Sequence, residues 1–360
     1  MPKNLIILIT IGFLQFFICT FTLSYSFYHN PKMTENQQID DMIAILQGKL
    51  EKDYQTGSFK RDAHPKHLGL LKAEFIISPN LAPELQVGIF KEPKTYSAII
   101  RSSNANGTVQ TDKIKDFRGF AIKIINVEGE KVTKDEKLSQ DFLLMSFPTM
   151  PLGTVKLFYD AVYYLIKIHP LAFVAKMLLT GKKDILTLLE TGKKYDTSPL
   201  DIQYWSTTPY KFGEKVVKYS LIPRSVYKST LPDVLTVDYL TENMQKHLEM
   251  EHALFDFCIQ FQKDKTTMPI EDSAIEWKEA DSPFIKVATL EIKKQHFNTH
   301  YRNQLAEDLS FSPAHSLLEH APVGGLNRAR AVIYKAISDF RHEKNNKTPF
   351  EPDLELYKNM

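Results

Sequence analysis

Residues 116–127 read DFRGFAIKIINV, and from Phe120 onward this stretch has the composition of a β-strand. Branched and aromatic side chains dominate it, as they do in strands. Turn-forming clusters such as Asn104-Ala105-Asn106-Gly107 separate it from its neighbours in the chain. Those neighbours are further strand-like runs: LLKAEFII at 70–77, YSAII at 96–100 and DFLLMSF at 141–147.

A helical segment and a second group of strands make up most of the remaining chain. Residues 154–191 have helical periodicity, broken at His169-Pro170 because proline disrupts a helix. Phe255 and Phe257 lie on one side of an alternating run, the pattern of a half-buried strand. The strand-like runs of this group are KVVKYSLI at 215–222, ALFDFCIQF at 253–261 and FIKVATLEI at 284–292.

A last predicted helix follows, and no linker divides the chain before it. Asn327 can cap this helix, and apolar residues recur with helical spacing up to about His342. One closed sheet flanked by helices is the simplest arrangement of these elements, because closure leaves no unpaired edge. We therefore predict an α+β fold built on a closed antiparallel β-barrel.

The composition is that of an ordinary globular protein. The 360 residues include 45 basic and 43 acidic side chains, a formal net charge of +2. Nucleic acid is not expected as a partner, since phosphate binding needs a concentrated basic excess. Cys19 and Cys258 are the only two cysteines, too few for a Cys-based zinc or iron–sulfur site. Any metal must be held by His, Tyr or carboxylates, or arrive inside a cofactor.

The N-terminal residues contain a long uncharged apolar run. Leu5 to Leu23 read LIILITIGFLQFFICTFTL, about the length of a membrane-spanning helix. Because a clean small-residue cleavage site is missing, an uncleaved anchor is favoured over a cleaved secretory signal, and a segment that does not insert is a third alternative. Lys3 favours export of the body of the protein to a periplasmic or extracellular side. Secretion after cleavage is the alternative localisation.

Arg330 and Tyr334 carry the clearest chemical signal of the last helix. They are four residues apart and therefore share one helix face. A tyrosine normally ionises with a pKa of about 10, and a guanidinium one turn away favours the phenolate. The pair can thus present an anionic oxygen to ferric iron, and Arg341 falls on nearly the same face. By spacing alone, solvated arginines and a core tyrosine are the commoner outcome.

Two further clusters combine arginine with groups that can move protons. The segment RDAH at 61–64 contains His64, and a histidine of near-neutral pKa can carry a proton between the two oxygens of a peroxide. A lone histidine is more often structural. The segment RSSN at 101–104 contains Arg101 and Ser103, and a surface arginine is its ordinary interpretation.

Together and in this order, the segments resemble the haem catalases and their shorter relatives, the catalase-like peroxidases and the haem domain of coral allene oxide synthase. RDAH resembles the distal Arg-x-x-His of catalases, and DFRGFAIK resembles their Asp-x-Arg-Gly-Phe-Ala-x-Lys strand. The resemblance covers roughly residues 58–342, and the set is specific although each piece is weak. The other matching segments are QDFLLMSFP at 140–148, WKEADSPFIKVATLEI at 277–292 and LSFSPAHSLLEHAPVGGLNRARAVIY at 309–334.

The resemblance implies a haem b cofactor and a role for each matching residue. Tyr334 would be the axial phenolate ligand of the iron, and Arg330 would stabilise it. His64 would be the distal acid–base group, with Ser103 bonded to its other ring nitrogen. The residues implied to face the haem propionates are Arg61, Arg101 and Arg341.

The same resemblance divides the chain into four parts. These are an anchor or signal segment at 1–29, a helical lead-in at 30–57, a catalase-like haem domain at 58–345 with a helical insert at 154–191, and a C-terminal tail at 346–360.

The sequence departs from the catalase pattern in two respects. Catalases carry a distal asparagine before the strand that DFLLMSF resembles, whereas 135–140 reads DEKLSQ and contains no asparagine; Gln140 and Ser139 are the two candidates to replace it. Since that asparagine positions the second peroxide, peroxidase activity is expected more than disproportionation of hydrogen peroxide. The long N-terminal arm and C-terminal domain of large catalases have no counterpart, so their NADPH site and much of their tetramer packing are not expected. The oligomeric state stays open.

The insert is strongly apolar between 154 and 180. Packing on the barrel is the main expectation. The alternative is that part of it contacts lipid beside the anchor and admits lipid hydroperoxides. The lysines suited to an anionic surface are Lys167, Lys176, Lys182 and Lys183.

The predicted function is a membrane-tethered haem-dependent peroxidase or catalase-like oxidoreductase acting on hydrogen peroxide or organic hydroperoxides. One alternative is a haem enzyme that converts fatty-acid hydroperoxides, like the allene oxide synthase domain. The other is a membrane-anchored haem-binding protein without turnover.

Overall fold

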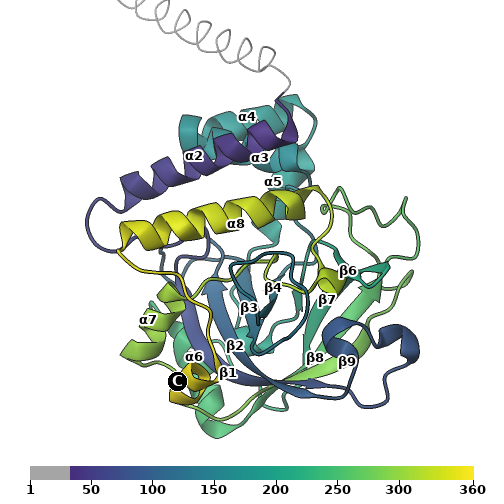
Figure 1. Cartoon of the computed structure of the whole chain (residues 1–360). Coiled ribbons are helices and arrows are strands. Elements are labelled where there is room, and N and C mark those ends of the chain that lie inside the picture. The colour runs from purple at the N-terminus through teal and green to yellow at the C-terminus, as the bar shows by residue number, and fades with distance from the viewer. Residues whose placement is uncertain (1–32) are drawn as a thin grey trace, which may run out of the picture.

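A closed antiparallel β-barrel forms the centre of the molecule (Figure 1). The computed structural model describes residues 33–360. Its strands are β1 (His67–Ile77), β2 (Thr95–Asn104), β3 (Arg118–Ile124), β4 (Gln140–Met145), β5 (Tyr204–Trp205), β6 (Tyr210–Phe212), β7 (Lys215–Pro223), β8 (Ala253–Phe261) and β9 (Ile285–Ile292).

Strand pairing closes the barrel as the sequence predicts. The strands pair in the order β5-β4-β3-β2-β1-β9-β8-β7, and β5 pairs again with β7 to complete the ring, while β6 extends the β7 edge. The sequence patterns found all of these strands except the two short ones, β5 and β6. Two or three residues are too few for a periodic pattern to show.

Aromatic rings fill the barrel. Phe257 is central, with ring centroids 5.0 Å from Phe75 and 4.7 Å from Phe142. Phe255 and Phe257 alternate inward on β8 and are fully buried, as predicted. The interior is therefore a packed core, and a ligand site has to lie outside it.

Three helices form a layer over one side of the barrel (Figure 1). They are α2 (Glu35–Asp53), α3 (Val155–Val162) and α8 (Gly325–Lys344). Their apolar faces meet in one buried cluster that includes Met42, Tyr159 and Ile333. Helix α2 corresponds to the predicted lead-in at 30–57, and Thr34 begins it with a capping box.

The remaining helical elements lie around this layer and at the far end of the barrel. A π-helical segment, Tyr163–Ile168, continues α3. The others are α4 (Pro170–Leu179), α5 (Lys183–Thr191), α6 (Tyr239–Met250), α7 (His300–Asp308), α9 (Leu354–Asn359) and short 3-10 turns at Pro83–Leu85, Gly88–Phe90, Pro199–Asp201 and Leu318–His320.

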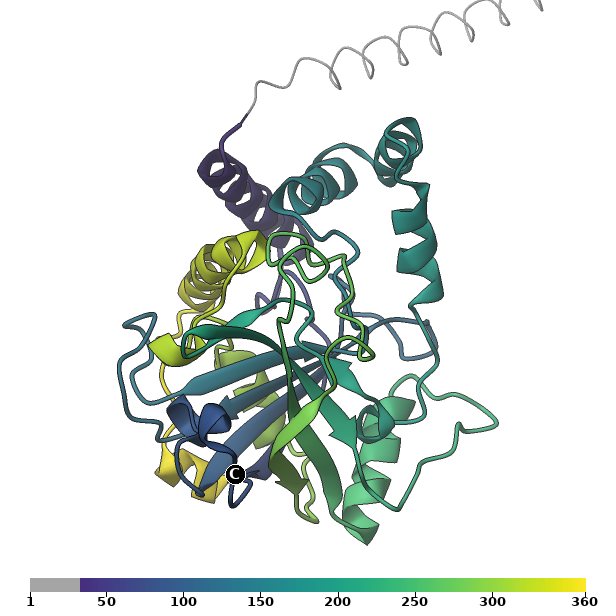
Figure 2. The same cartoon turned by 90° about the vertical axis from the view of Figure 1, so that its right-hand side faces the viewer.

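The insert packs mainly on other helices and not on the barrel strands, which corrects the main expectation. Helix α3 packs on α2 and α8, and α4 packs on α3 and α5 through a separate cluster around Phe173 and Met177. Figure 2 shows α4 and α5 standing away from the strands. Periodicity identifies the apolar face of a helix, but it does not identify what covers that face.

The predicted start of the last helix is also corrected. Helix α8 begins at Gly325, with Gly324 at a φ of 88° as the residue before it. Asn327 lies inside the first turn, where its amide donates to the carbonyl oxygens of Pro209 and Val323. A glycine at positive φ lets the chain turn into the helix without a side-chain cap.

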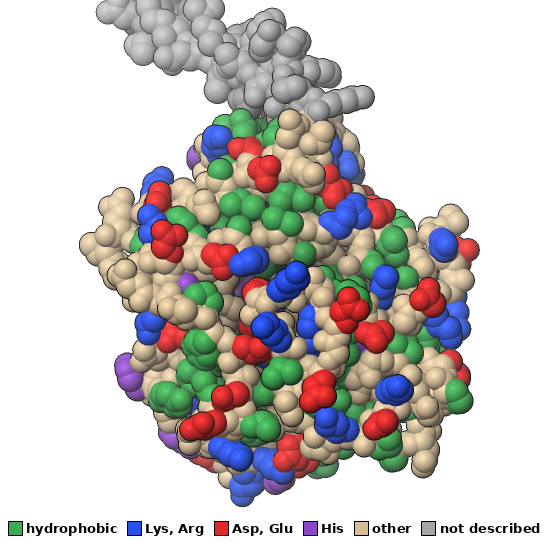
Figure 3. All heavy atoms as spheres, viewed as in Figure 1, with side chains coloured by type: hydrophobic (Ala, Val, Ile, Leu, Met, Phe, Trp, Pro, Cys, Tyr) green, Lys and Arg blue, Asp and Glu red, His purple; other side chains and the backbone are tan. Residues whose placement is uncertain are grey.

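The apolar N-terminal run lies outside the described residues. Within residues 33–360, no helix is both long enough and apolar enough to cross a membrane. On the face drawn in Figure 3, acidic and basic side chains are interspersed without a single-sign patch. This mixture agrees with the near-neutral net charge.

Candidate active site

A cavity of about 420 Å³ lies between the barrel wall and helix α8. Its floor is the outer face of β2, β3 and β4, where Arg101, Ala121 and Leu143 stand in one row. The volume is in the usual range for a ligand pocket. All seven residues predicted for the site line this cavity: Arg61, His64, Arg101, Ser103, Arg330, Tyr334 and Arg341.

His64 lies on the barrel side of the cavity in a constrained conformation. Its φ is 58°, which is uncommon for a residue other than glycine. Arg101 holds this turn by donating to the His64 carbonyl oxygen over 2.9 Å, and Ser103 Oγ lies 3.0 Å from His64 Nδ1. Burial, followed by the charges of Arg101 and Arg330, lowers the pKa of His64 to about 3. The imidazole is therefore neutral at physiological pH and able to accept a proton.

Gly119 makes room for the pair of His64 and Ser103. A Cβ at position 119 would lie 2.6 Å from His64 Nδ1 and 2.8 Å from Ser103 Oγ. The strand has to carry a glycine here because any side chain would push the imidazole away. A glycine inside a strand signals a close approach, and Gly119 within DFRGFAIK carries that signal, but its contact with His64 was not predicted.

Helix α8 supplies the opposite side of the cavity. Arg330 Nη2 lies 3.4 Å from the Tyr334 hydroxyl, and the guanidinium carbon lies 5.3 Å from the centre of the tyrosine ring. Thr208 Oγ1 and Asn327 Oδ1 accept hydrogen bonds from the other Arg330 nitrogen and fix its position. The one-turn spacing thus places the Arg330 guanidinium beside the Tyr334 hydroxyl, as predicted.

Three more arginines gather at one end of the cavity. Arg61 and Arg101 both donate to the Ala306 carbonyl oxygen over 3.0 Å, and Arg341 donates to the carbonyl of Glu307. Burial and the neighbouring charge of Arg61 lower the pKa of Arg341 to about 9. This end of the cavity is therefore strongly basic.

Glu307 balances part of this charge and was not found from the sequence. Its carboxylate lies 3.7 Å from Arg61 and 3.9 Å from Arg101, and 2.9 Å from His67. Burial alone would raise its pKa, but the His67 hydrogen bond and the arginines hold the pKa well below its ordinary value. Asp62 also lines the cavity, so two carboxylates lie among the three arginines, which leaves a net positive charge that suits an anionic ligand group. Glu307 lies on α7, which no sequence pattern singled out.

Neither Gln140 nor Ser139, the two candidates to replace the distal asparagine, reaches the cavity. Gln140 Oε1 accepts a hydrogen bond from the Leu317 amide, and the Ser139 hydroxyl donates to Glu351. In the described part of the chain, no Asn or Gln side chain lines the cavity. Apolar residues take this place, among them Leu143, Met145, Met150 and Phe158.

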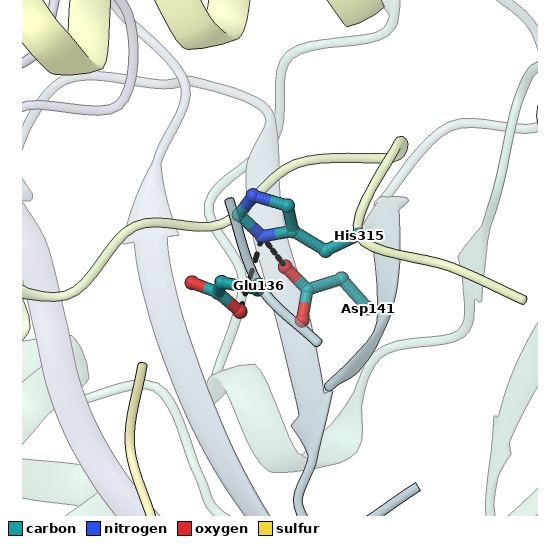
Figure 4. Close-up of side chains that lie close together, drawn as sticks. All are labelled: Glu136, Asp141 and His315. Atoms are coloured by element: carbon teal, nitrogen blue, oxygen red, sulfur yellow. Dashed lines mark hydrogen bonds and ion pairs between the residues drawn. The ribbon is translucent and has the colours of Figure 1, made fainter. Parts of the chain in front are cut away.

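A second cluster of titratable groups lies further along the same barrel face (Figure 4). Glu136, Asp141 and His315 have ligand-type atoms within 4.8 Å of one another. The Lys123 ammonium contacts all three, with Asp141 Oδ1 at 2.8 Å and His315 Nδ1 at 3.3 Å. It takes the position that a bound cation would need. The cluster is therefore a buried ion-pair network.

His315 carries a positive charge in this network. Burial and Lys123 would lower its pKa, but hydrogen bonds to Asp135 and Asp141 raise it to about 9. The distances to these carboxylates are 3.2 Å and 3.0 Å. A protonated imidazole has no lone pair for a metal, which agrees with a structural role.

The barrel, the helical layer and the cavity between them define the catalase fold. A fungal catalase matches with a TM-score of 0.64 at 16% identity, over 83% of this chain and 62% of that protein. A bacterial catalase matches with 0.63 at 16% identity, over 85% and 63%, and catalase A from Saccharomyces cerevisiae with 0.62 at 14% identity, over 84% and 67%.

The match establishes the fold and no more. This chain spans 62–67% of the length of these three catalases. No family model and no curated protein matches it. The resemblance to catalases is confirmed at the level of fold, and the likeness to allene oxide synthase stays a prediction.

Proposed function

We propose that the protein is a haem-dependent oxidoreductase that cleaves the O–O bond of peroxides. The observation that carries the proposal is the pairing of Tyr334 with Arg330 on α8, facing a cavity whose other wall carries His64. Tyrosine is an established proximal ligand of haem iron, and the Arg330 guanidinium lies within 3.4 Å of the Tyr334 hydroxyl.

The residues present fit a haem. Tyr334 would hold the iron, and the basic end formed by Arg61, Arg101 and Arg341 would bind the propionates by charge-assisted hydrogen bonds. The apolar walls suit the porphyrin faces. A bound haem would supply the redox-active iron that breaks the peroxide bond, and the chain supplies binding, orientation and electrostatics.

His64 would transfer the proton of the peroxide from one oxygen to the other. With Nδ1 engaged by Ser103, Nε2 is the ring nitrogen left for a substrate. Its low pKa keeps it neutral, so that it can take the proton from the near peroxide oxygen and return it to the departing one. Gly119 and Arg101 hold the ring and its backbone in place.

The apolar distal wall favours organic hydroperoxides over hydrogen peroxide. Without a polar amide, the cavity has little to orient a second small peroxide, whereas its apolar side chains match an acyl chain. Conversion of fatty-acid hydroperoxides is therefore the second candidate function. A haem-binding protein without turnover is the third, and the orientation of His64 argues against it.

The first test is the absorption spectrum of the purified protein loaded with haem. We expect a high-spin ferric haem with a tyrosinate signature, lost in Tyr334→Phe. Tyr301→Phe, on the exposed surface of α7, is the matched control and should keep the signature. Absence of haem binding, or an unchanged spectrum in Tyr334→Phe, contradicts the proposal.

The second test separates turnover from binding. His64→Ala should keep haem content while peroxide turnover falls by about 100-fold or more, the range of general acid–base catalysis. An inert wild type that binds haem would instead support the carrier function. Comparing hydrogen peroxide with a fatty-acid hydroperoxide as substrate distinguishes the first two candidates.

The cellular setting is part of the same proposal. Residues 5–23 would tether the protein to a membrane, with the haem domain on the exported side. Cleavage of this segment, with secretion of the rest, is the alternative. N-terminal sequencing of the protein purified from membranes shows whether the segment is retained or cleaved.

A further inference from the structure

Helix α4 is apolar on two opposite faces. Ala172, Phe173 and Met177 point into the cluster shared with α3 and α5. Leu171, Val174 and Leu178 lie on the other face and are exposed. A helix that is apolar all round is normally buried, so the outer face of α4 indicates a partner.

We call the exposed apolar residues of α4 and of the π-helical segment before it the α4 patch. The exposed fraction is 71% for Leu171 and 75% for Leu179, values that are high for leucine. Within α4 itself no charge interrupts the outer face, because Lys176 turns inward to pair with Asp160 at 3.1 Å. The patch consists of Leu165, Ile168, Leu171, Val174, Leu178 and Leu179.

Exposed lysines flank the α4 patch. Lys167 precedes α4, and Lys182 and Lys183 follow it, with Asp184 as the one acidic residue of the sequence between positions 161 and 189. An apolar centre with lysines at its margins is the pattern of a surface that lies in the interface of an anionic bilayer.

The start of the described chain lies at the same end of the molecule. Helix α2 begins beside α3 and contacts the π-helical segment that carries Leu165 and Ile168 (Figures 1 and 2). Nine residues separate the apolar run ending at Leu23 from Met33. Such a stretch reaches at most about 35 Å. A bilayer that holds the run therefore lies within reach of the patch.

The π-helical part of the α4 patch directly follows the cavity wall along the chain. Phe158 and Val162 of α3 line the cavity, and the π-helical segment with two patch residues follows directly after Val162. One unbroken helical stretch thus runs from the cavity wall to the exposed apolar surface.

We propose that the α4 patch docks on an anionic lipid bilayer and that the hydroperoxide substrate reaches the cavity from that lipid. The substrate class rests on the proposed peroxide chemistry, whereas the docking does not. Docking brings an acyl chain to the apolar helix that leads to the distal wall.

The docking is tested with a fluorescent label, without any need for activity. Leu171→Cys is labelled with an environment-sensitive dye in the full chain carrying Cys19→Ser, since Cys258 is buried. The protein is reconstituted in phosphatidylcholine–phosphatidylglycerol vesicles. If the α4 patch lies in the bilayer, the emission of the dye at position 171 should shift to the blue and should be quenched by nitroxide-labelled lipids. Leu354→Cys, on α9 at the opposite end, is the control and should be quenched by aqueous iodide instead.

Two results would overturn the docking. Iodide quenching at Leu171 equal to that at Leu354 means a solvent-exposed patch. If the label at position 171 is protected from both iodide and nitroxide lipids, and this protection is already present in detergent, the chain's own apolar run or a second copy covers the patch.

Substrate delivery is tested with charges on the patch. The double variant Leu171→Lys, Leu178→Lys can no longer bury these two side chains in the bilayer. Its turnover of a phospholipid hydroperoxide in the same vesicles should therefore fall at least about tenfold. Turnover of hydrogen peroxide should be unchanged. The control pair, Met250→Lys with Leu354→Lys, should leave both turnovers unchanged.

The outcomes keep the two proposals apart. Equal turnover of the lipid substrate by the charged variant and the wild type contradicts delivery from the bilayer. No turnover of any peroxide by the wild type contradicts the proposed function, and the label at Leu171 still decides the docking.

Discussion

At the scale of single residues, the site depends on the space left by Gly119. In Gly119→Ala, the added methyl group would overlap the contact between His64 and Ser103. We expect haem binding to persist and kcat/KM for peroxide to fall by about 10- to 100-fold, because a displacement of the base of this order is costly. Steady-state kinetics of the haem-loaded variant and wild type measure this fall in kcat/KM.

Gly48→Ala is the matched control for this substitution. Gly48 lies on α2 with open space around its Cα, so a methyl group there should leave turnover unchanged and stabilise the helix by up to about 1 kcal/mol. Kinetics of Gly119→Ala within twofold of the wild type would show that the imidazole position does not depend on this glycine.

At the scale of elements, a buried aspartate attaches α4 to α3. Asp160 is 5% exposed and accepts hydrogen bonds from Lys156 and Lys176, both at 3.1 Å. Asp160→Asn removes this charge from a partly buried pair, so we expect the free energy of unfolding to fall by about 1–3 kcal/mol. Amide hydrogen exchange should accelerate across α4, as mass spectrometry can measure.

Asp339→Asn is the control at this scale. Asp339 pairs with Lys335 on the exposed surface of α8, and both side chains are 52% exposed. Such a surface pair contributes about 0.5 kcal/mol or less. Equal effects of the two substitutions, or exchange in α4 unchanged by Asp160→Asn, would exclude the proposed attachment.

Element prediction from the sequence succeeded where patterns are long. The strands β1, β3, β8 and β9 and the helices α2 and α8 all follow runs of regular periodicity. The break before α4 was also found, because a proline marks it. The helices α6 and α7 were missed, and α7 carries Glu307, so that this part of the site was missed with it.

At the scale of the whole molecule, three buried histidines contribute to the pH dependence of stability. His315 has a pKa raised to about 9, so it holds a proton in the folded state that the unfolded chain has lost above about 6.5. Its contribution is complete below pH 6.5 and is lost as pH rises through 9. His64 and His320 have pKa values lowered to about 3, so stability falls as pH drops below 6.5. We expect maximal stability of the haem-free protein near pH 6.5.

Urea denaturation between pH 5 and 10 measures this profile. In the wild type, the free energy of unfolding should fall by about 1–3 kcal/mol between pH 6.5 and 9, and His315→Gln should remove this decrease. His296→Gln, at an exposed position, should leave the slope intact. An alkaline slope that persists in His315→Gln would assign the effect to other groups.

The sequence by itself determined the closed barrel and the seven residues around the cavity. Strand alternation and the i, i+4 spacing of Arg330 and Tyr334 are local properties, and the order of the motifs allowed the catalase resemblance to be recognised. Only the tertiary structure decided the environment of each side chain. It turned Gln140 away from the cavity, placed Lys123 among Glu136, Asp141 and His315, and left the outer face of α4 uncovered. The physical reason is that periodicity specifies which face of an element is apolar, whereas strand register and helix docking specify what meets it.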